Sequence, residues 1–276
     1  MQSPIFLGGM KMAHGILILP GFTAQHSLER DKPLYRIFSF ERFCKLLVDR
    51  RIYFRNVVKW EDTYEYPIRF MPEDRKDFLQ RGLYGLCLTK AYDKEPMWKL
   101  YSGKNLNGVC IRTTAEAICN SLQLFDYTDG VCWKTAFIGN VKYVSYLDDN
   151  PTQMFYEPDR FEYPDYLYPA YIKRKEFSYE EEVRIMLYNG DPIKLNSDGQ
   201  LFGVKSLDFI HEVILFPYAS KEDIALLEAI CMAFGVKVSV RQSDFLNKIK
   251  ENSFPLPPEQ NLYWGQAKHG YNILDS

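Results

Sequence analysis

Three charged residues stand at alternate positions in the run Tyr179-Glu180-Glu181-Glu182-Val183-Arg184. The run lies where a loop enters an apolar strand, and strand alternation predicts Glu180, Glu182 and Arg184 on one face, with the intervening residues opposite. Two carboxylates and a guanidinium on a common face can pair bidentately, hold a ribose hydroxyl or poise a general base. A solvated charge ladder on an edge strand is the alternative, and the pattern alone does not separate the two.

A second candidate is Arg36, which stands between Tyr35 and Ile37 in an otherwise apolar strand. A buried charge is costly unless it is paired, so Arg36 either has a partner or points to solvent. Asp62 and Glu65 lie in an aromatic and acidic loop. They could cap a helix, bind a cation or pair with Arg36, and a solvated loop is the simpler interpretation.

Aromatic residues could frame a planar ligand in the segment Met97-Trp98-Lys99-Leu100-Tyr101. Trp98 and Tyr101 are three residues apart, so they are neighbours only if the segment is helical. Packing in the core is the alternative use of Trp98.

Several classes of site find no support in the sequence. No GxGxxG or GKS/GKT motif follows a predicted strand, which argues against a Rossmann or P-loop nucleotide site. The 6 cysteines are scattered without a CxxC pair and the 4 histidines are dispersed, so no metal site is predicted. A net charge of -2 gives no reason to expect general nucleic-acid binding. No Ser/His/Asp or Cys/His arrangement can be argued.

The order of the elements predicts an α+β protein with a single mixed-sheet core and flanking helices. One domain is expected over 33–245, between an irregular N-terminal lead-in (1–32) and an irregular C-terminal tail (246–276). The insertion at 148–170, rich in Pro, Asp and Tyr, is long enough to suggest a functional loop. Strands are predicted for 34–38, 51–54, 83–89, 108–112, 141–146, 183–188, 212–216 and 236–240, and helices for 40–49, 72–80, 96–101, 115–122 and 220–234.

No apolar segment approaches the roughly 20 residues that a transmembrane helix needs. The N-terminal apolar run at 15–20 is too short for the core of a signal peptide and is cut by a proline. A cytoplasmic location without membrane contact is therefore predicted.

Five motifs, in order, resemble a bacterial family known only as a domain of unknown function (DUF 2971). The last fits the pattern Tyr-Glu-x-Glu-x-Arg, and the resemblance runs from about residue 34 to about residue 184. The motifs are Leu34-Tyr35-Arg36, Ile52-Tyr53-Phe54, Trp60-Glu61-Asp62-Thr63-Tyr64-Glu65, Met97-Trp98-Lys99-Leu100-Tyr101 with Gly108-Val109-Cys110-Ile111, and Tyr179-Glu180-Glu181-Glu182-Val183-Arg184.

The chain also resembles ADP-ribosyltransferases, which carry an Arg or His on an early strand and a Glu-x-Glu motif on a late one. Here Arg36 and Glu180-x-Glu182 fall in that order. The resemblance implies NAD as the small nucleotide-like ligand, with Arg36 on a phosphate or ribose oxygen. Glu182 would hold the ribose hydroxyl while positive charge develops at the sugar. The implied cofactor contacts are Tyr35, Trp98, Tyr101 and Arg184.

Three functions follow as hypotheses. The first is an NAD-using ADP-ribosyltransferase-like or NAD-cleaving enzyme, in bacterial conflict or phage defence. The second is a non-enzymatic binding or interaction module, in which the Glu/Arg run is a structural ion-pair network and the 148–170 insertion is a partner surface. The third is a metal-dependent hydrolase built on Asp62, Glu65 and Glu182.

Overall fold

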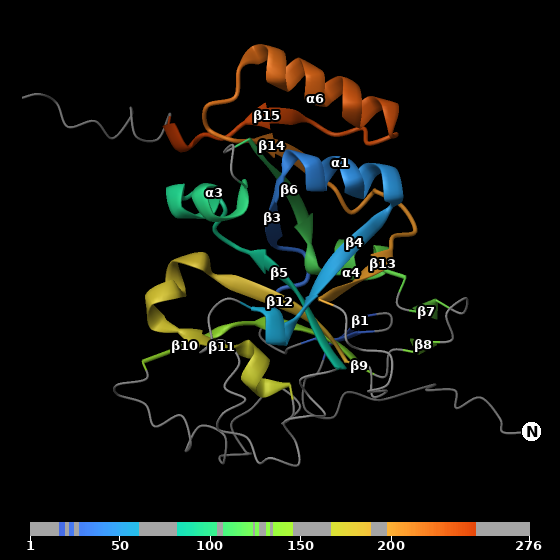
Figure 1. Ribbon diagram of the computed structural model, residues 1–276, viewed down its shortest axis with the longest axis vertical. Helices are drawn as coiled ribbons and strands as arrows, with labels where there is room; N and C mark the ends of the chain where they lie inside the picture. Colours follow the sequence, from blue (N-terminus) through green and yellow to red (C-terminus); the bar gives the residue numbers. More distant parts are fainter. Residues whose placement is uncertain are drawn as a thin grey trace, which may run out of the picture.

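The computed structural model describes residues 17–19, 22–24, 28–60, 82–103, 107–123, 125–126, 131–132, 135–145, 167–188 and 198–246. Its centre is an 11-stranded mixed sheet, flanked by helices (Figure 1). The predicted α+β class with a single mixed-sheet core is confirmed.

The central strands of the sheet carry the candidate site. β12 (Glu182–Tyr188) pairs antiparallel with β9 (Thr135–Asn140) on one side and with β5 (Leu83–Thr89) on the other. Strands β2 (Phe22–Ala24) and β9 are parallel, as are β14 (Glu212–Leu215) and β15 (Val240–Gln242). Across the sheet the strands follow the order β1 (Leu17–Leu19), β2, β9, β12, β5, β3 (Pro33–Ser39), β6 (Gly108–Thr114), β14 and β15. Off this path, β4 (Arg51–Asn56) pairs with β5, and β13 (Gly199–Gly203) pairs with β4.

Two small pairs of strands lie outside this sheet. They are the parallel pair β10 (Lys142–Val144) and β11 (Ile172–Arg174), and the antiparallel pair β7 (Phe125–Asp126) and β8 (Val131–Cys132). Within the described residues, the short 3₁₀ helices are η1 (Val57–Lys59), η4 (Tyr168–Tyr171) and η5 (Lys175–Glu180).

One face of the sheet is covered by three helices that bury their apolar sides in the largest core cluster. These are α1 (Phe40–Asp49), α4 (Ala115–Ser121) and α6 (Lys221–Ala233), whereas α3 (Glu95–Tyr101) packs in a separate cluster with Ile37, Cys110 and Ile214. Figure 1 shows α1 and α3 on opposite sides of β3. Side chains cap two of these helices: the Ser39 side chain accepts from the Arg42 N–H, and Ser220 forms a capping box with Asp223.

Alternation along the central strands separates apolar from polar residues. Val183, Ile185 and Leu187 of β12 belong to the largest core cluster, so Glu182 and Arg184 face the other side of the sheet. On that side a second apolar cluster contains Met186, Tyr188, Phe137 and Tyr171, while the α3 cluster lies over β3 and β6. The charged residues of β12 are therefore enclosed by protein on both sides.

The sheet divides beside these residues. β3 pairs with β5 only at Tyr35 and Thr89, whereas β4 pairs with β5 further along, at Gly85 and Tyr84. Between these two contacts, β5 has no strand partner on this side among the described residues, so the β5 backbone there is open to side chains. This division is called the β3/β5 fork below.

Three predicted elements differ from the structure. The strand expected at 236–240 is wrong, because the Val236 N–H donates to the Cys231 carbonyl and completes the helix C-terminus, so the strand begins only at Val240. The strand expected at 141–146 is only Lys142–Val144. The lead-in expected to be irregular contains β1 and β2, which gain a partner in β9 that the sequence does not reveal.

The helix predicted at 72–80, most of the 148–170 insertion and the tail from residue 247 lie outside the described residues. The division of the chain into a lead-in, one domain and a tail stays a prediction.

Candidate functional site

Glu182 and Arg184 lie at the centre of the sheet, with β9 on one side and β5 on the other, and Glu180 lies just before β12. Their residue exposures are 2% for Glu180, 5% for Glu182 and 0% for Arg184. The interpretation as a solvated ladder on an edge strand is therefore wrong.

The three side chains gather for a reason other than simple strand alternation. Glu180 ends the 3₁₀ helix η5, and Glu181 adopts a left-handed conformation with φ 44° before β12 begins at Glu182. This turn aims both neighbours of Glu181 inward and leaves Glu181 exposed, where its carboxylate pairs with Lys94 at 3.0 Å. A non-glycine residue in this conformation costs about 1–2 kcal/mol, so tertiary contacts must hold the turn. One is the Lys90 N–H, which donates to the Glu181 carbonyl at 3.1 Å.

Arg184 and Glu182 form a bidentate ion pair. Arg184 Nε donates to Glu182 Oε1 at 3.0 Å and Nη2 donates to Oε2 at 2.8 Å, while Nη1 donates to the Ala170 carbonyl at 2.6 Å. The guanidinium also lies over the Trp60 ring, 4.3 Å from its centroid. A Cβ on Gly85 would meet that ring at 2.6 Å, so the glycine makes room for it.

Burial by itself would raise the pKa of Glu182. The charges of Arg184 and Lys173, together with hydrogen bonds from Arg184 and Cys87, outweigh that effect and lower the pKa from its usual 4.5 to about 2. Glu182 is therefore ionised at any physiological pH, and its charge is matched by the cations around it.

The cation that sequence reasoning missed is Lys173 on β11. Its residue exposure is 4%, and its Nζ lies 2.8 Å from Glu180 Oε2 and 3.5 Å from Glu182 Oε2. The neighbouring strand β10 contributes Tyr143, whose hydroxyl accepts from the Glu182 N–H at 2.8 Å. Lys173 begins the basic run Lys173-Arg174-Lys175, so its local sequence is also that of a solvated charge and gave no separate signal.

Arg36 enters the site through the β3/β5 fork. Its Nη1 donates to the Cys87 carbonyl of β5, and its buried Nε has no hydrogen-bond partner among the described residues. Burial lowers the pKa of Arg36, and the guanidinium interacts electrostatically with Tyr101 and Glu182. The interpretation that Arg36 points to solvent is wrong. Because the Cys87 side chain hydrogen-bonds to the Glu182 carboxylate, Cys87 contacts both Arg36 and Glu182.

The aromatic candidates divide into one that contacts the charged residues and two that pack elsewhere. The Tyr101 hydroxyl donates to Glu180 Oε2 at 3.2 Å, and the residue is 40% exposed. Trp98 is 4% exposed and lies edge-on to Tyr92, whose ring is tilted against that of Tyr35 with the ring centroids 4.2 Å apart. For Trp98 and Tyr35, core packing is therefore the use that the structure displays.

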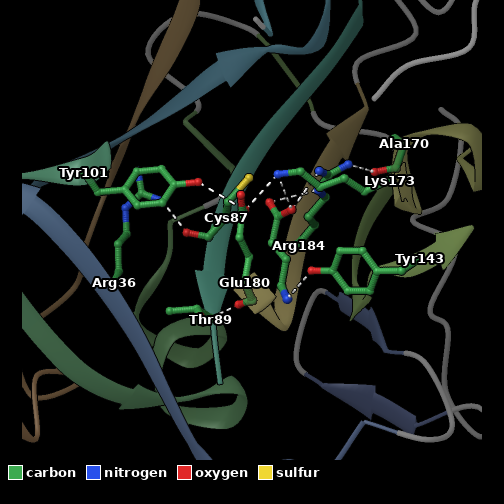
Figure 2. A network of polar contacts seen from close by, with 10 residues as sticks. Arg36, Cys87, Thr89, Tyr101, Tyr143, Ala170, Lys173, Glu180 and Arg184 are labelled. Carbon is green, nitrogen blue, oxygen red and sulfur yellow. Dashed lines mark hydrogen bonds and ion pairs between the residues drawn. The ribbon is translucent and has the colours of Figure 1, made fainter. Parts of the chain in front are cut away.

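Figure 2 shows the connected network, with Arg36 and Tyr101 at one end and Tyr143 and Ala170 at the other. Two carboxylates and two cations, Lys173 and Arg184, balance one another, and Arg36 adds a further positive charge. Such a site can accept a ligand hydroxyl at a carboxylate and an anionic oxygen at Arg36. Asp62 and Glu65 lie outside the described residues, so their predicted roles stay predictions.

No group of three or more His, Cys, Asp or Glu residues that could hold a metal ion occurs within the described part of the chain. None of the helices in that part is long and apolar enough to cross a bilayer.

Residues 97–185 match the model of a family described as "Protein of unknown function (DUF2971)". The match begins in α3 and ends in β12, so it includes Tyr101, Lys173, Glu180, Glu182 and Arg184 but not Arg36. It confirms the resemblance to that family between these two elements. No curated protein matches the chain.

Two solved structures of DarT from Thermus sp. 2.9 are similar to this chain. One is in complex with NAD+ (11% identity, 79% of this chain and 99% of that chain covered), and the other with ADP-ribosylated ssDNA (12% identity, 80% and 99% covered). The TM-score is 0.37 for both.

Proposed function

We propose that this chain is an NAD-using enzyme of the ADP-ribosyltransferase kind, or one that cleaves NAD. The observation that carries the proposal is that one residue of β5 connects Arg36, at the β3/β5 fork, to a buried carboxylate. Arg36 and Glu182 are 146 positions apart in the printed sequence, from 36 to 182, yet both contact Cys87. Strongly perturbed ionisable groups gathered at one place are a feature of functional sites.

The residues at the fork fit NAD as a substrate. NAD carries phosphate and ribose oxygens, and the buried Arg36 Nε is a donor without a partner in the described chain. An unmade hydrogen bond at a buried donor is unfavourable, so an acceptor oxygen placed there would be stabilising. The partly exposed ring of Tyr101 offers a flat apolar surface for the nicotinamide.

The carboxylates supply the chemistry. When the bond between nicotinamide and ribose breaks, positive charge develops at the sugar, and an ionised Glu180 or Glu182 beside the ribose hydroxyls stabilises that charge. Lys173 and Arg184 hold the two carboxylates in fixed positions, so little reorganisation accompanies the reaction. A cytoplasmic location and a role in bacterial conflict or phage defence belong to the same proposal.

A non-enzymatic interaction module remains the second candidate, and one observation favours it. Both oxygens of Glu182 accept from Arg184, and Arg184 uses Nε, Nη1 and Nη2 within the protein. A pair so fully engaged can serve purely to hold β12 against η4 and β11.

Binding of NAD separates these two candidates. A ligand that binds only the folded state stabilises it, by about 2.7 kcal/mol when its concentration is 100 times its Kd. We therefore expect NAD to raise the melting temperature of the full chain, and nicotinamide to be released on incubation. The control is Arg36→Met, in which both effects should weaken. A melting temperature unchanged by NAD at millimolar concentrations, with no nicotinamide released, would favour the interaction module.

A further inference from the structure

The two buried carboxylates differ in how firmly their present partners hold them. Glu182 is tied through both of its oxygens to a guanidinium at 3.0 and 2.8 Å, and its own N–H donates to Tyr143. Bidentate charge-assisted pairs are among the strongest polar contacts in proteins. A ligand that displaced Arg184 from one oxygen of Glu182 would break half of this bidentate pair inside the sheet, where Arg184 is 0% exposed. Glu182 is therefore a poor acceptor for a ligand.

Glu180 has a partner of a different kind. Besides the Lys173 ammonium at 2.8 Å, Glu180 Oε2 accepts from the Tyr101 hydroxyl at 3.2 Å. Burial, together with the charges of Glu180 and Glu182, raises the pKa of Tyr101, so the phenol stays protonated and acts as a neutral donor. A sugar hydroxyl makes the same kind of hydrogen bond to a carboxylate. Exchange of one hydroxyl for the other conserves the hydrogen bond to Glu180 and leaves no buried charge without a partner.

The position of Tyr101 makes this exchange feasible. Tyr101 is the last residue of α3, and it is 40% exposed although its hydroxyl reaches the buried Glu180. The N-terminal end of α3 is fixed separately, because Lys94 donates to the Tyr179 carbonyl at 2.9 Å and pairs with Glu181. A rotation of the Tyr101 side chain can therefore withdraw its hydroxyl while the helix stays in place.

We propose that Glu180 is the carboxylate that receives a ligand hydroxyl at this site, and that the Tyr101 hydroxyl occupies that position until the ligand arrives. Glu182 and Lys173 are then positioning residues that hold Glu180 in place. This inference rests on the proposed use of NAD. It transfers to Glu180 the hydroxyl-binding role that the resemblance to ADP-ribosyltransferases implied for Glu182.

The test compares the Kd of the full chain for NAD in the wild type and in Tyr101→Phe and Glu180→Gln, by calorimetry. Tyr101→Phe keeps the ring and removes the competing hydroxyl, so we expect NAD to bind about tenfold more tightly. Glu180→Gln should bind NAD about tenfold more weakly. The matched probe is an NAD analogue without the 2′-hydroxyl on the nicotinamide ribose, for which the two substitutions should change the Kd much less.

The outcomes separate the inference from the proposed function. If NAD binds the wild type, and Tyr101→Phe leaves the Kd unchanged or weakens binding, the inference is wrong while the NAD proposal stands. If Glu180→Gln binds NAD as tightly as the wild type does, the same conclusion follows. If no variant binds NAD, the proposed function fails first and the inference falls with it. Because Tyr101→Phe is conservative, the test does not depend on whether Glu180→Gln folds.

Discussion

Replacing Glu182 by Gln removes one charge from the centre of the sheet and keeps the shape of the side chain. Arg184 then remains at 0% exposure without the carboxylate that accepts from its Nε and Nη2. Breaking a buried ion pair from one side costs about 3–5 kcal/mol. The pKa gives a similar figure, because a fall from 4.5 to about 2 corresponds to about 3 kcal/mol at 1.4 kcal/mol per unit.

The free energy of unfolding of Glu182→Gln should therefore fall by about 3 kcal/mol or more, measured from urea unfolding with the m-value checked against the wild type. Two variants serve as controls. Glu181→Gln changes the exposed neighbour, whose pair with Lys94 contributes at most about 1 kcal/mol. The double change Glu182→Leu with Arg184→Met removes both charges and should recover part of the loss. If Glu182→Gln lowers the free energy of unfolding by less than about 1 kcal/mol, other groups must stabilise the Arg184 charge in place of Glu182, and the reasoning fails.

Three further predictions concern the same region. The stabilisation from Glu182 is complete above its unfolded pKa of about 4.5 and is lost as the pH falls from there through its folded value of about 2. Urea midpoints measured across this interval should therefore fall more steeply for the wild type than for Glu182→Gln. Arg36→Met leaves the Cys87 carbonyl without its donor and should cost about 1–3 kcal/mol in the free energy of unfolding; no loss would mean that this contact is not maintained in solution. Glu181→Gly should be about 1 kcal/mol more stable than Glu181→Ala, because both lose the pair with Lys94 and only glycine is relaxed at φ 44°; equal melting temperatures would contradict the left-handed turn.

The local signals in the sequence were sufficient for most elements. Ser39 and Ser220 start helices as side-chain caps predict, and the strand predicted at 83–89 has the same bounds in the structure. These features depend on residues within a few positions of one another. The strand expected at 236–240 failed because its first residues complete the end of α6, which the alternating valines concealed.

The site depends on long-range pairings, and this explains what the sequence could and could not predict. The alternation of Glu182 and Arg184 is local and was predicted, whereas the centre of the sheet as their location follows from pairing with β5 and β9. The inward turn of Glu180 depends on the left-handed Glu181, a conformation that the sequence does not mark by a glycine. Lys173 was missed because its two partners lie on other elements, 7 and 9 residues further along the chain.

The two carboxylates of this site are expected to respond differently in NAD binding, because Glu180 accepts a neutral hydroxyl besides its buried cation, whereas Glu182 is paired with Arg184 through both of its oxygens. Replacing Glu182 leaves the Arg184 guanidinium at the centre of the sheet without its carboxylate, so the main effect of this substitution is a loss of stability. Glu180→Gln also breaks a buried pair, with Lys173 at 2.8 Å, so it costs stability as well. In addition it changes the group that accepts the Tyr101 hydroxyl, so its loss should also appear in binding. A purely structural network predicts instead that substitutions at both positions act on stability alone. Comparing Glu180→Gln with Glu182→Gln in unfolding and in NAD binding therefore decides whether this buried network serves to receive a ligand or only to hold the sheet together.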